Sequence, residues 1–412
     1  MMKITKKNRF IPVIAAVAIQ LCLGTAYIWS VFQTGIAKSL FGGNNATAGI
    51  TFSALLAMLG FGSTFGGKLA KKYSPRITVL AGGFILAAGF FGASLATPQA
   101  PWVLWLTYGL LGGFGAGMTY STTIACAQKW YPDKKGLVTG IIVASLGLGG
   151  VVFTPLAETL IGLFGGVAVG ELMTLRVLSG IFLVICTTGG LFIQDPPADL
   201  QLGSSQPKDN KPKNIAGKDF TLTEMLKTPQ FYLLFFTFFF GCMAGLMMIG
   251  FAKPIAVAKG MKEVASIGVL IISIFNAAGR LSCGALADKF GPKRTLLGVL
   301  LGTAILAPMI NIANGYFIFL LIALISFCYG GLLSNFPVLT AELFGNKNVA
   351  TNYGLVLLGF GLGAIIASYI AGYFKNLAAQ DITLILPAFL IASAAAVISM
   401  ILLSMVKKPQ TK

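Results

Sequence analysis

Twelve apolar runs, each long enough to cross a lipid bilayer as a helix, constrain what this chain can fold into. One crossing needs about 20 mostly apolar residues, and proline, glycine or charge clusters bound each run. The runs lack the alternation of polar and apolar residues that marks a membrane β-strand. The sequence therefore predicts an all-α membrane protein with transmembrane helices near 11–37, 46–70, 77–97, 102–128, 136–163, 171–193, 229–255, 263–287, 295–313, 316–343, 349–374 and 382–406.

The first run resembles a secretory signal peptide in one respect, because Lys3, Lys6, Lys7 and Arg9 precede it. It is too long for the apolar core of such a peptide, and it has no clear cleavage pattern of small residues. We therefore interpret 11–37 as the first transmembrane helix.

The net charge of +18 indicates topology. Of the 30 Lys and Arg residues, 23 fall at the two termini and in the loops that follow the even-numbered spans, and five fall in the opposite loops. Cytoplasmic loops carry the excess of positive charge, so both termini are expected to be cytoplasmic, in the cell (inner) membrane. Because the positive charge follows the topology, we expect no nucleic-acid partner.

No cofactor or metal site is expected. The chain has no histidine, the commonest metal ligand. Its cysteines lie inside apolar spans without close spacing and read as small packing residues: Cys22, Cys126, Cys186, Cys242, Cys283 and Cys328. An enzyme would need a nucleophile, a metal cluster or an acid–base pair at membrane depth, and none is found, so we expect no enzyme.

Residues 194–228 form the one long polar stretch and read as a cytoplasmic linker. Within it, Thr221 and Glu224 have the spacing of a helix capping box, which indicates a short helix. The linker divides the chain into two six-helix bundles, at 1–193 and 229–412.

The two halves carry a repeated motif. GKLAKKYSPR, from Gly67, corresponds to GALADKFGPK, from Gly284, at an offset of 217 residues that Pro75 and Pro292 keep. Each copy follows the second span of its half. Parallel halves of this kind are a transporter design in which the substrate site lies at the membrane midplane between them.

The second copy of the motif, GALADKFGPKR, resembles the loop motif of the major facilitator superfamily. The resemblance implies a gating role for Gly284, Asp288, Gly291 and Arg294. The first copy departs from the family pattern, with Lys71 in place of the aspartate and Ser74 in place of the second glycine, so a gating contact made by the aspartate is not expected in that half.

Further stretches resemble the branch of the superfamily that holds the oxalate:formate antiporter and the monocarboxylate transporters. They cover nearly the whole chain: AYIWSVF from Ala26, QKWYPDKKGLVTG from Gln128, TPQFYLL from Thr228, FNAAGR from Phe275 and NYG from Asn352. The resemblance implies a transporter of a small anion, most like a prokaryotic lactate transporter, that works as a monomer.

Arg280 is the sharpest candidate for substrate binding. It lies near the middle of the 263–287 span, where a cation costs at least about 2.5–3.5 kcal/mol, and acidic residues lie near the ends of the spans. A guanidinium group matches a carboxylate with two parallel hydrogen bonds. Asn276 lies one turn earlier on the same face. The resemblance places an asparagine there in the oxalate branch and an aspartate in animal monocarboxylate transporters, so the obvious proton carrier is missing.

The resemblance also implies an aromatic cavity lined by Tyr27, Tyr120 and Tyr329, although single aromatics in membrane helices are more often packing or interface residues. In the oxalate transporter a lysine lies seven residues after the tyrosine of the NYG motif. Here that position is Phe360. One cavity cation suits one carboxylate, and the phenyl ring suits a short hydrocarbon tail, so a monocarboxylate is favoured over a dicarboxylate.

We therefore expect a secondary active transporter of a monocarboxylate of the lactate or pyruvate type, working by alternating access and with a proton as co-substrate. Moving a lone anion inward against 100 mV costs about 2.3 kcal/mol, so net uptake needs either a proton or a counter-anion. An anion exchanger of the oxalate:formate type is the alternative. A sensor built on a transporter scaffold would bind the substrate without moving it.

Overall fold

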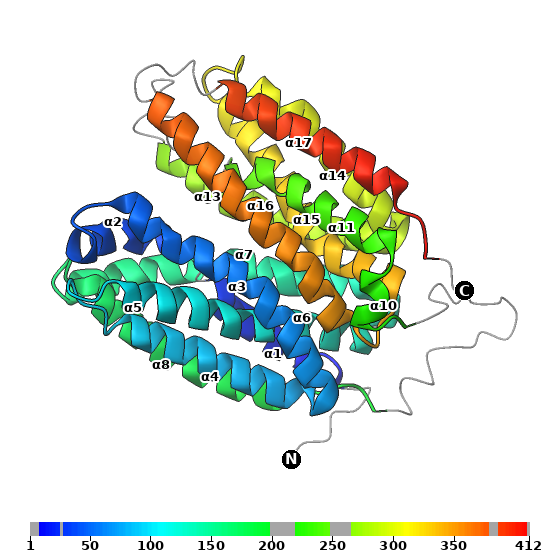
Figure 1. The fold of residues 1–412 in the computed structure, drawn as a ribbon, viewed down its shortest axis with the longest axis horizontal. Coiled ribbons are helices and arrows are strands. Elements are labelled where there is room, and N and C mark those ends of the chain that lie inside the picture. The colour runs from blue at the N-terminus through cyan, green and yellow to red at the C-terminus, as the bar shows by residue number, and fades with distance from the viewer. Residues whose placement is uncertain (1–7, 25–27, 198–218, 248–264, 379–385, 410–412) are drawn as a thin grey trace, which may run out of the picture.

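The computed structural model describes residues 8–24, 28–197, 219–247, 265–378 and 386–409, and within these ranges it is helical (Figure 1). The described residues form no β-strand apart from an isolated bridge between Thr97 and Ala100. The prediction of an all-α chain is confirmed. Tyr27, one of the predicted site residues, lies outside the described residues.

The first half of the chain forms one group of helices, drawn in blue to green in the lower part of Figure 1. Its helices are α1 (Ile11–Leu23), α2 (Trp29–Leu40), α3 (Asn45–Lys72), α4 (Pro75–Ala93), α5 (Trp102–Leu104), the π-helical η3 (Trp105–Gly112), α6 (Gly113–Trp130), the short 3₁₀ turn η4 (Pro132–Lys134), α7 (Lys135–Leu163) and α8 (Gly170–Phe192).

The second half forms the other group, drawn in green to red. Its helices are α10 (Leu222–Leu226), α11 (Pro229–Gly241), α13 (Ala265–Phe290), α14 (Pro292–Met309), α15 (Phe317–Phe344), α16 (Val349–Ala378) and α17 (Leu386–Met405).

The described helices follow the twelve predicted spans. Eight meet the length and hydropathy of a membrane crossing on their own. The first predicted span contains α1 and α2, and residues 25–27 between them lie outside the described residues. The fourth runs through α5, η3 and α6, which are separate only because the hydrogen-bond pattern changes to π-helical between Trp105 and Gly112.

Proline and short polar residues set where helices begin. Pro75 opens α4 behind Ser74, whose hydroxyl accepts a hydrogen bond from the Ile77 amide at 3.2 Å. Proline suits the first helical position because its missing N–H would have no partner there. The predicted capping box of Thr221 and Glu224 is present and starts α10.

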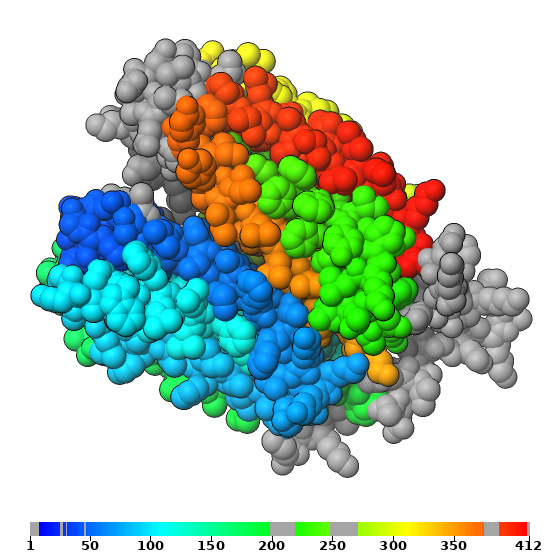
Figure 2. Space-filling view, viewed as in Figure 1, coloured from blue at the N-terminus to red at the C-terminus, as the bar shows by residue number. Residues whose placement is uncertain are grey.

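The two groups of helices meet along two seams. In one seam α3 runs beside α16, and Figure 2 shows the blue surface of α3 against the orange surface of α16. Glycines permit this approach: a Cβ on Gly67 would lie 2.6 Å from the Cα of Thr351, and one on Gly354 would lie 2.8 Å from the Cα of Thr64. In the other seam α7 runs beside α13, where a Cβ on Gly284 would lie 2.9 Å from the Cα of Gly140.

Both seams begin at the end of the molecule that holds Lys72, Lys135, Asp288 and Asn348, which we call the closed end. The two groups diverge toward the opposite end, where α2 lies (Figure 1). Large apolar side chains stand exposed on the outer faces of the helices, among them Phe84 at 63% and Leu163 at 74%. Such a surface is unsuited to water but matches a lipid bilayer.

Candidate substrate-binding site

Arg280 lies on the seam between the two halves, in the middle of α13. Its side chain is fully buried, at 0% exposure. One terminal nitrogen (NH1) donates a hydrogen bond to the backbone oxygen of Val143 on α7, at 2.6 Å. The predicted burial of this cation is therefore confirmed, and its guanidinium group reaches across to the other half of the molecule.

Asn276 lies one turn before Arg280 and is also buried. Its side-chain nitrogen donates a hydrogen bond of 3.4 Å to the Ser326 backbone oxygen on α15. A Cβ on Gly147 of α7 would lie 3.4 Å from the Asn276 Oδ1 atom and 3.5 Å from the Arg280 Cζ atom. Gly147 thus leaves the polar ends of both side chains facing a position on α7 that has no side chain.

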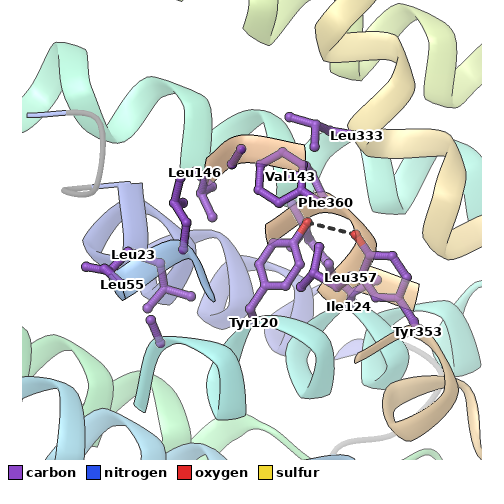
Figure 3. Packing of buried hydrophobic residues seen from close by; sticks show 14 of the residues in the cluster. Leu23, Leu55, Tyr120, Ile124, Val143, Leu146, Leu333, Tyr353, Leu357 and Phe360 are labelled. Carbon is purple, nitrogen blue, oxygen red and sulfur yellow. Dashed lines mark hydrogen bonds between the residues drawn. The ribbon is translucent and has the colours of Figure 1, made fainter. Parts of the chain in front are cut away.

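Near this position Tyr120 contacts the other half of the molecule through Tyr353, which was not predicted as a site residue. Its hydroxyl lies 3.3 Å from the hydroxyl of Tyr353 on α16, and the ring centroids are 6.1 Å apart (Figure 3). Both tyrosines are buried. Tyr353 is the tyrosine of the NYG motif, so the motif pointed to this residue. The prediction used the motif only to identify Phe360, seven residues later.

Phe360 lies on α16, two turns after Tyr353. Its side chain is 5% exposed, and its ring centroid lies 5.4 Å from that of Phe238 on α11. It belongs to the same large hydrophobic cluster as Tyr120, Tyr353 and Val143, all labelled in Figure 3. The ring contact that the structure gives Phe360 lies within its own half, against α11.

Tyr329 is placed differently. It lies on α15, is buried, and its ring packs against Gly245, where a Cβ would overlap the ring. The next residue, Gly330, is the one that contacts the Asn276–Arg280 turn: its Cβ would lie 2.9 Å from the Asn276 carbonyl carbon and 3.1 Å from the Arg280 nitrogen. Tyr329 therefore has a described packing role beside this turn.

Asp288 bridges the halves at the closed end. Its two carboxylate oxygens accept hydrogen bonds from the backbone amides of Gly136, at 2.7 Å, and Leu137, at 2.8 Å. These amides belong to the first turn of α7, whose N–H groups have no partner within the helix, and a negative charge is favourable there. Lys135 adds a further bond across the halves, from its Nζ atom to the Asn346 Oδ1 atom at 3.1 Å.

The other motif residues have distinct local roles. Gly291 has a φ of +87°, a left-handed conformation that favours glycine. Ser74 in the first copy has a φ of −173°, which any residue adopts, so the change from glycine to serine causes no strain there. Gly284 allows the close crossing with α7, and Arg294 is exposed.

A model of the Major Facilitator Superfamily matches residues 14–314 and 245–412, which together span nearly the whole chain. The chain belongs to the major facilitator superfamily. An uncharacterized MFS-type transporter of Escherichia coli, YhjX, is 32% identical over 87% of each chain. The oxalate:formate antiporter of Oxalobacter formigenes is 29% identical over 88% of this chain and 85% of its own.

The apicoplast pyruvate carrier 1 of Toxoplasma gondii is 24% identical and covers 92% of this chain and 86% of its own. Among solved structures, the MFS transporter FucP in the outward conformation is 16% identical, covers 98% of this chain and 100% of its own, and has a TM-score of 0.72. The structural likeness supports the superfamily fold of twelve helices in two bundles.

We predict that Asp288→Asn opens the closed end of this superfamily member. The substitution removes a charge that receives two hydrogen bonds, each worth about 1.5–3 kcal/mol, and a loss of about 1.4 kcal/mol changes a population ratio about tenfold. Spin labels on Tyr73→Cys and Lys289→Cys, both exposed, should report a longer distance in the variant. Asp133→Asn, an exposed acid at the same end, is the matched control and should leave the distance distribution as in the parent protein.

Proposed function

We propose that this chain is a secondary active transporter of a small monocarboxylate of the lactate or pyruvate type. The observation that carries the proposal is Arg280. It is a fully buried cation at the middle of α13, on the seam where the two halves contact each other. A guanidinium group there can bind a carboxylate and lose that contact as the halves rock. The relatives named for oxalate, formate and pyruvate transport support a small organic acid as the substrate.

The closed end corresponds to the cytoplasmic side in this proposal. The loops at that end hold the excess of Lys and Arg, which the positive-inside rule assigns to the cytoplasm. Because both seams are packed at this end, the structure corresponds to a state closed toward the cytoplasm. Both termini lie on the cytoplasmic side of the cell (inner) membrane in this proposal. The working unit is proposed to be the monomer.

The test is uptake of labelled lactate into liposomes that contain the purified protein and no internal substrate. An inward pH gradient should drive accumulation above the level reached without a gradient, because the proton compensates the charge of the anion. A sensor would bind lactate without accumulation. Transport that requires an internal carboxylate and ignores the pH gradient would replace the proposal by the alternative, anion exchange of the oxalate:formate type, which the antiporter relative favours.

Glu171 is the acidic residue we propose to test for proton coupling. Among the described residues it is the one acidic side chain that is fully buried, at 1% exposure, whereas Glu158 is exposed. Its Oε1 atom accepts a hydrogen bond from the Ala168 amide at 3.0 Å, and its Oε2 atom has no hydrogen-bond partner within the described part of the chain. It packs against Gly35 of α2.

We predict that Glu171→Gln abolishes uptake driven by a pH gradient and leaves lactate–lactate exchange intact. Glutamine keeps the size and the Ala168 hydrogen bond but has no exchangeable carboxyl proton. Glu158→Gln is the matched control and should retain coupled uptake. If coupled uptake survives in Glu171→Gln, the carboxylate acts only as the acceptor for the loop before α8, and the proton travels with the substrate or through water.

A further inference from the structure

At the closed end, the two copies of the loop motif place side chains of opposite charge at the start of the facing helix. In the second half, Asp288 supplies a carboxylate to the first amides of α7. The corresponding position of the first half is Lys71, which faces the start of α16, the counterpart of α7. The first turn of α16 contains no acidic residue. The motif itself therefore supplies an anion at the start of α7 and a cation at the start of α16, where the Asp219 carboxylate accepts a hydrogen bond from the Lys347 amide at 3.1 Å.

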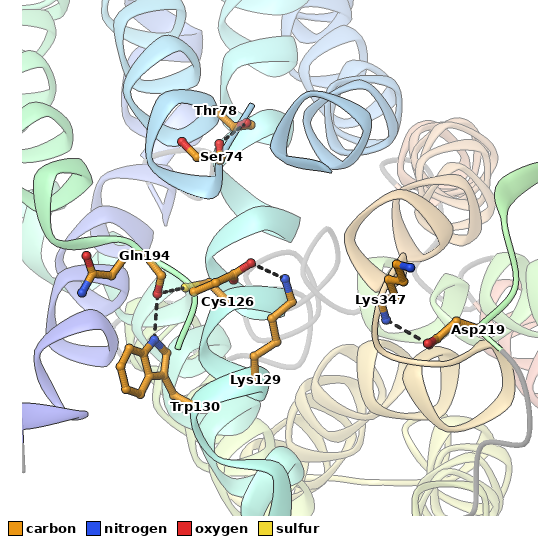
Figure 4. Close-up of polar contacts among 9 residues, drawn as sticks. Ser74, Thr78, Cys126, Lys129, Trp130, Gln194, Asp219 and Lys347 are labelled. Carbon is orange, nitrogen blue, oxygen red and sulfur yellow. Dashed lines mark hydrogen bonds and ion pairs between the residues drawn. The ribbon is translucent and has the colours of Figure 1, made fainter. Parts of the chain in front are cut away.

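A cavity of about 200 Å³ lies at this position, between the ends of α3 and α6 and the start of α16. Its lining includes three lysines, Lys71, Lys129 and Lys347, and one acid, Asp195. Lys129 pairs with Asp195 at 2.6 Å (Figure 4). The lining keeps two net positive charges, and the amides of the first turn of α16 add partial positive charge.

A buried hydroxyl group also faces this cavity. Thr122 of α6 lines it and is 2% exposed, and its Oγ1 atom has no hydrogen-bond partner among the described residues. A buried hydroxyl without a partner is costly, so a polar ligand in the cavity would satisfy it. This observation is independent of the lysines and of the helix start.

We propose that the cavity binds a phosphate group, which replaces the carboxylate missing from the first copy of the motif and holds the closed end together. A phosphate has several acceptor oxygens for the lysines, the Thr122 hydroxyl and the amides of α16. Its charge of up to two matches the net charge of the lining. Because the cavity joins α3 and α6 of one half to α16 of the other, occupancy favours the state in which this end is closed.

The test uses the full chain in detergent with the spin labels at Tyr73→Cys and Lys289→Cys. Inorganic phosphate should increase the population with the short distance in a saturable way, and chloride at equal ionic strength should not. Lys71→Gln should raise the half-saturating phosphate concentration at least tenfold, and Thr122→Val severalfold. Lys134→Gln, an exposed lysine outside the cavity, is the matched control and should respond like the parent protein.

Lys71→Asp gives the sharpest result, because it restores the carboxylate of the second copy. This variant should be closed without phosphate and should not respond to it. A lipid headgroup is the other source of phosphate, so the measurement is repeated in nanodiscs of phosphatidylcholine with and without phosphatidic acid. Closure by phosphatidic acid alone, lost in Lys71→Gln, would identify the lipid as the source. If neither phosphate source closes the molecule, or if Lys71→Gln and Lys134→Gln respond alike, the proposal is wrong.

Discussion

Arg280→Ala should abolish substrate binding and transport while leaving folded protein in the membrane. The guanidinium group is fully buried on the seam between the halves, so it makes its hydrogen bonds out of contact with water. Each charge-assisted bond to a carboxylate is worth about 1.5–3 kcal/mol, which corresponds to a loss of affinity of about tenfold or more for each bond. Labelled lactate binding and uptake measure the effect.

Arg280→Lys should rescue this loss poorly. An ammonium group keeps the charge but has no planar fork, so it cannot hold the Val143 oxygen and a bidentate carboxylate together. Arg176→Ala is the matched control, since Arg176 also lies within a membrane helix but is exposed and bonds to Ser94 of its own half. Uptake at the parental rate by Arg280→Ala, with intact protein verified by size-exclusion chromatography, would place the substrate elsewhere.

The helices could be predicted from the sequence because apolar run length and the residues at helix starts are local signals. Pro75, Pro292 and the Thr221–Glu224 pair lie where the structure starts α4, α14 and α10. The close contact at Gly24 was not predicted. A Cβ there would lie 2.7 Å from the Cα of Gly149 on α7, a tertiary contact that the local sequence does not define.

Arg280 could be found from the sequence because a cation at membrane depth is rare. Its partners could not, because Val143 contributes a backbone oxygen and Gly147 contributes the absence of a side chain. A backbone oxygen and a missing side chain cannot be recognised as site features from composition or residue spacing. Tyr353 depends on a pairing across the two halves, which only the folded arrangement of α6 and α16 defines.

The glycine spacings show the same limit. Gly109 and Gly113 have the four-residue spacing that permits close helix contacts, and the structure places these contacts inside one half, against α3. Gly359 and Gly363 likewise pack against α11 of their own half. Spacing indicates that a helix is approached closely, but it does not identify the partner helix, so the seam glycines could not be separated from those within a bundle.

Phe360→Lys should lower the affinity for lactate and raise the affinity for oxalate, because the number of cations near Arg280 sets how many carboxylates can be neutralised. In the parent protein the second carboxylate of oxalate would be buried without a partner, at a cost of several kcal/mol; a cost of about 3 kcal/mol corresponds to discrimination of roughly a hundredfold. A lysine at Phe360 supplies the missing charge where the resembling oxalate transporter has one. With lactate the new charge stays uncompensated, and the contact with the phenyl ring is lost. Phe360→Leu is the control, because it removes the ring without adding charge and should weaken lactate binding without improving oxalate binding. Competition of lactate and oxalate against labelled lactate measures both preferences.

If Phe360→Lys still binds lactate with an unchanged preference over oxalate, Phe360 does not face the substrate. The argument that a single cation selects a monocarboxylate then fails.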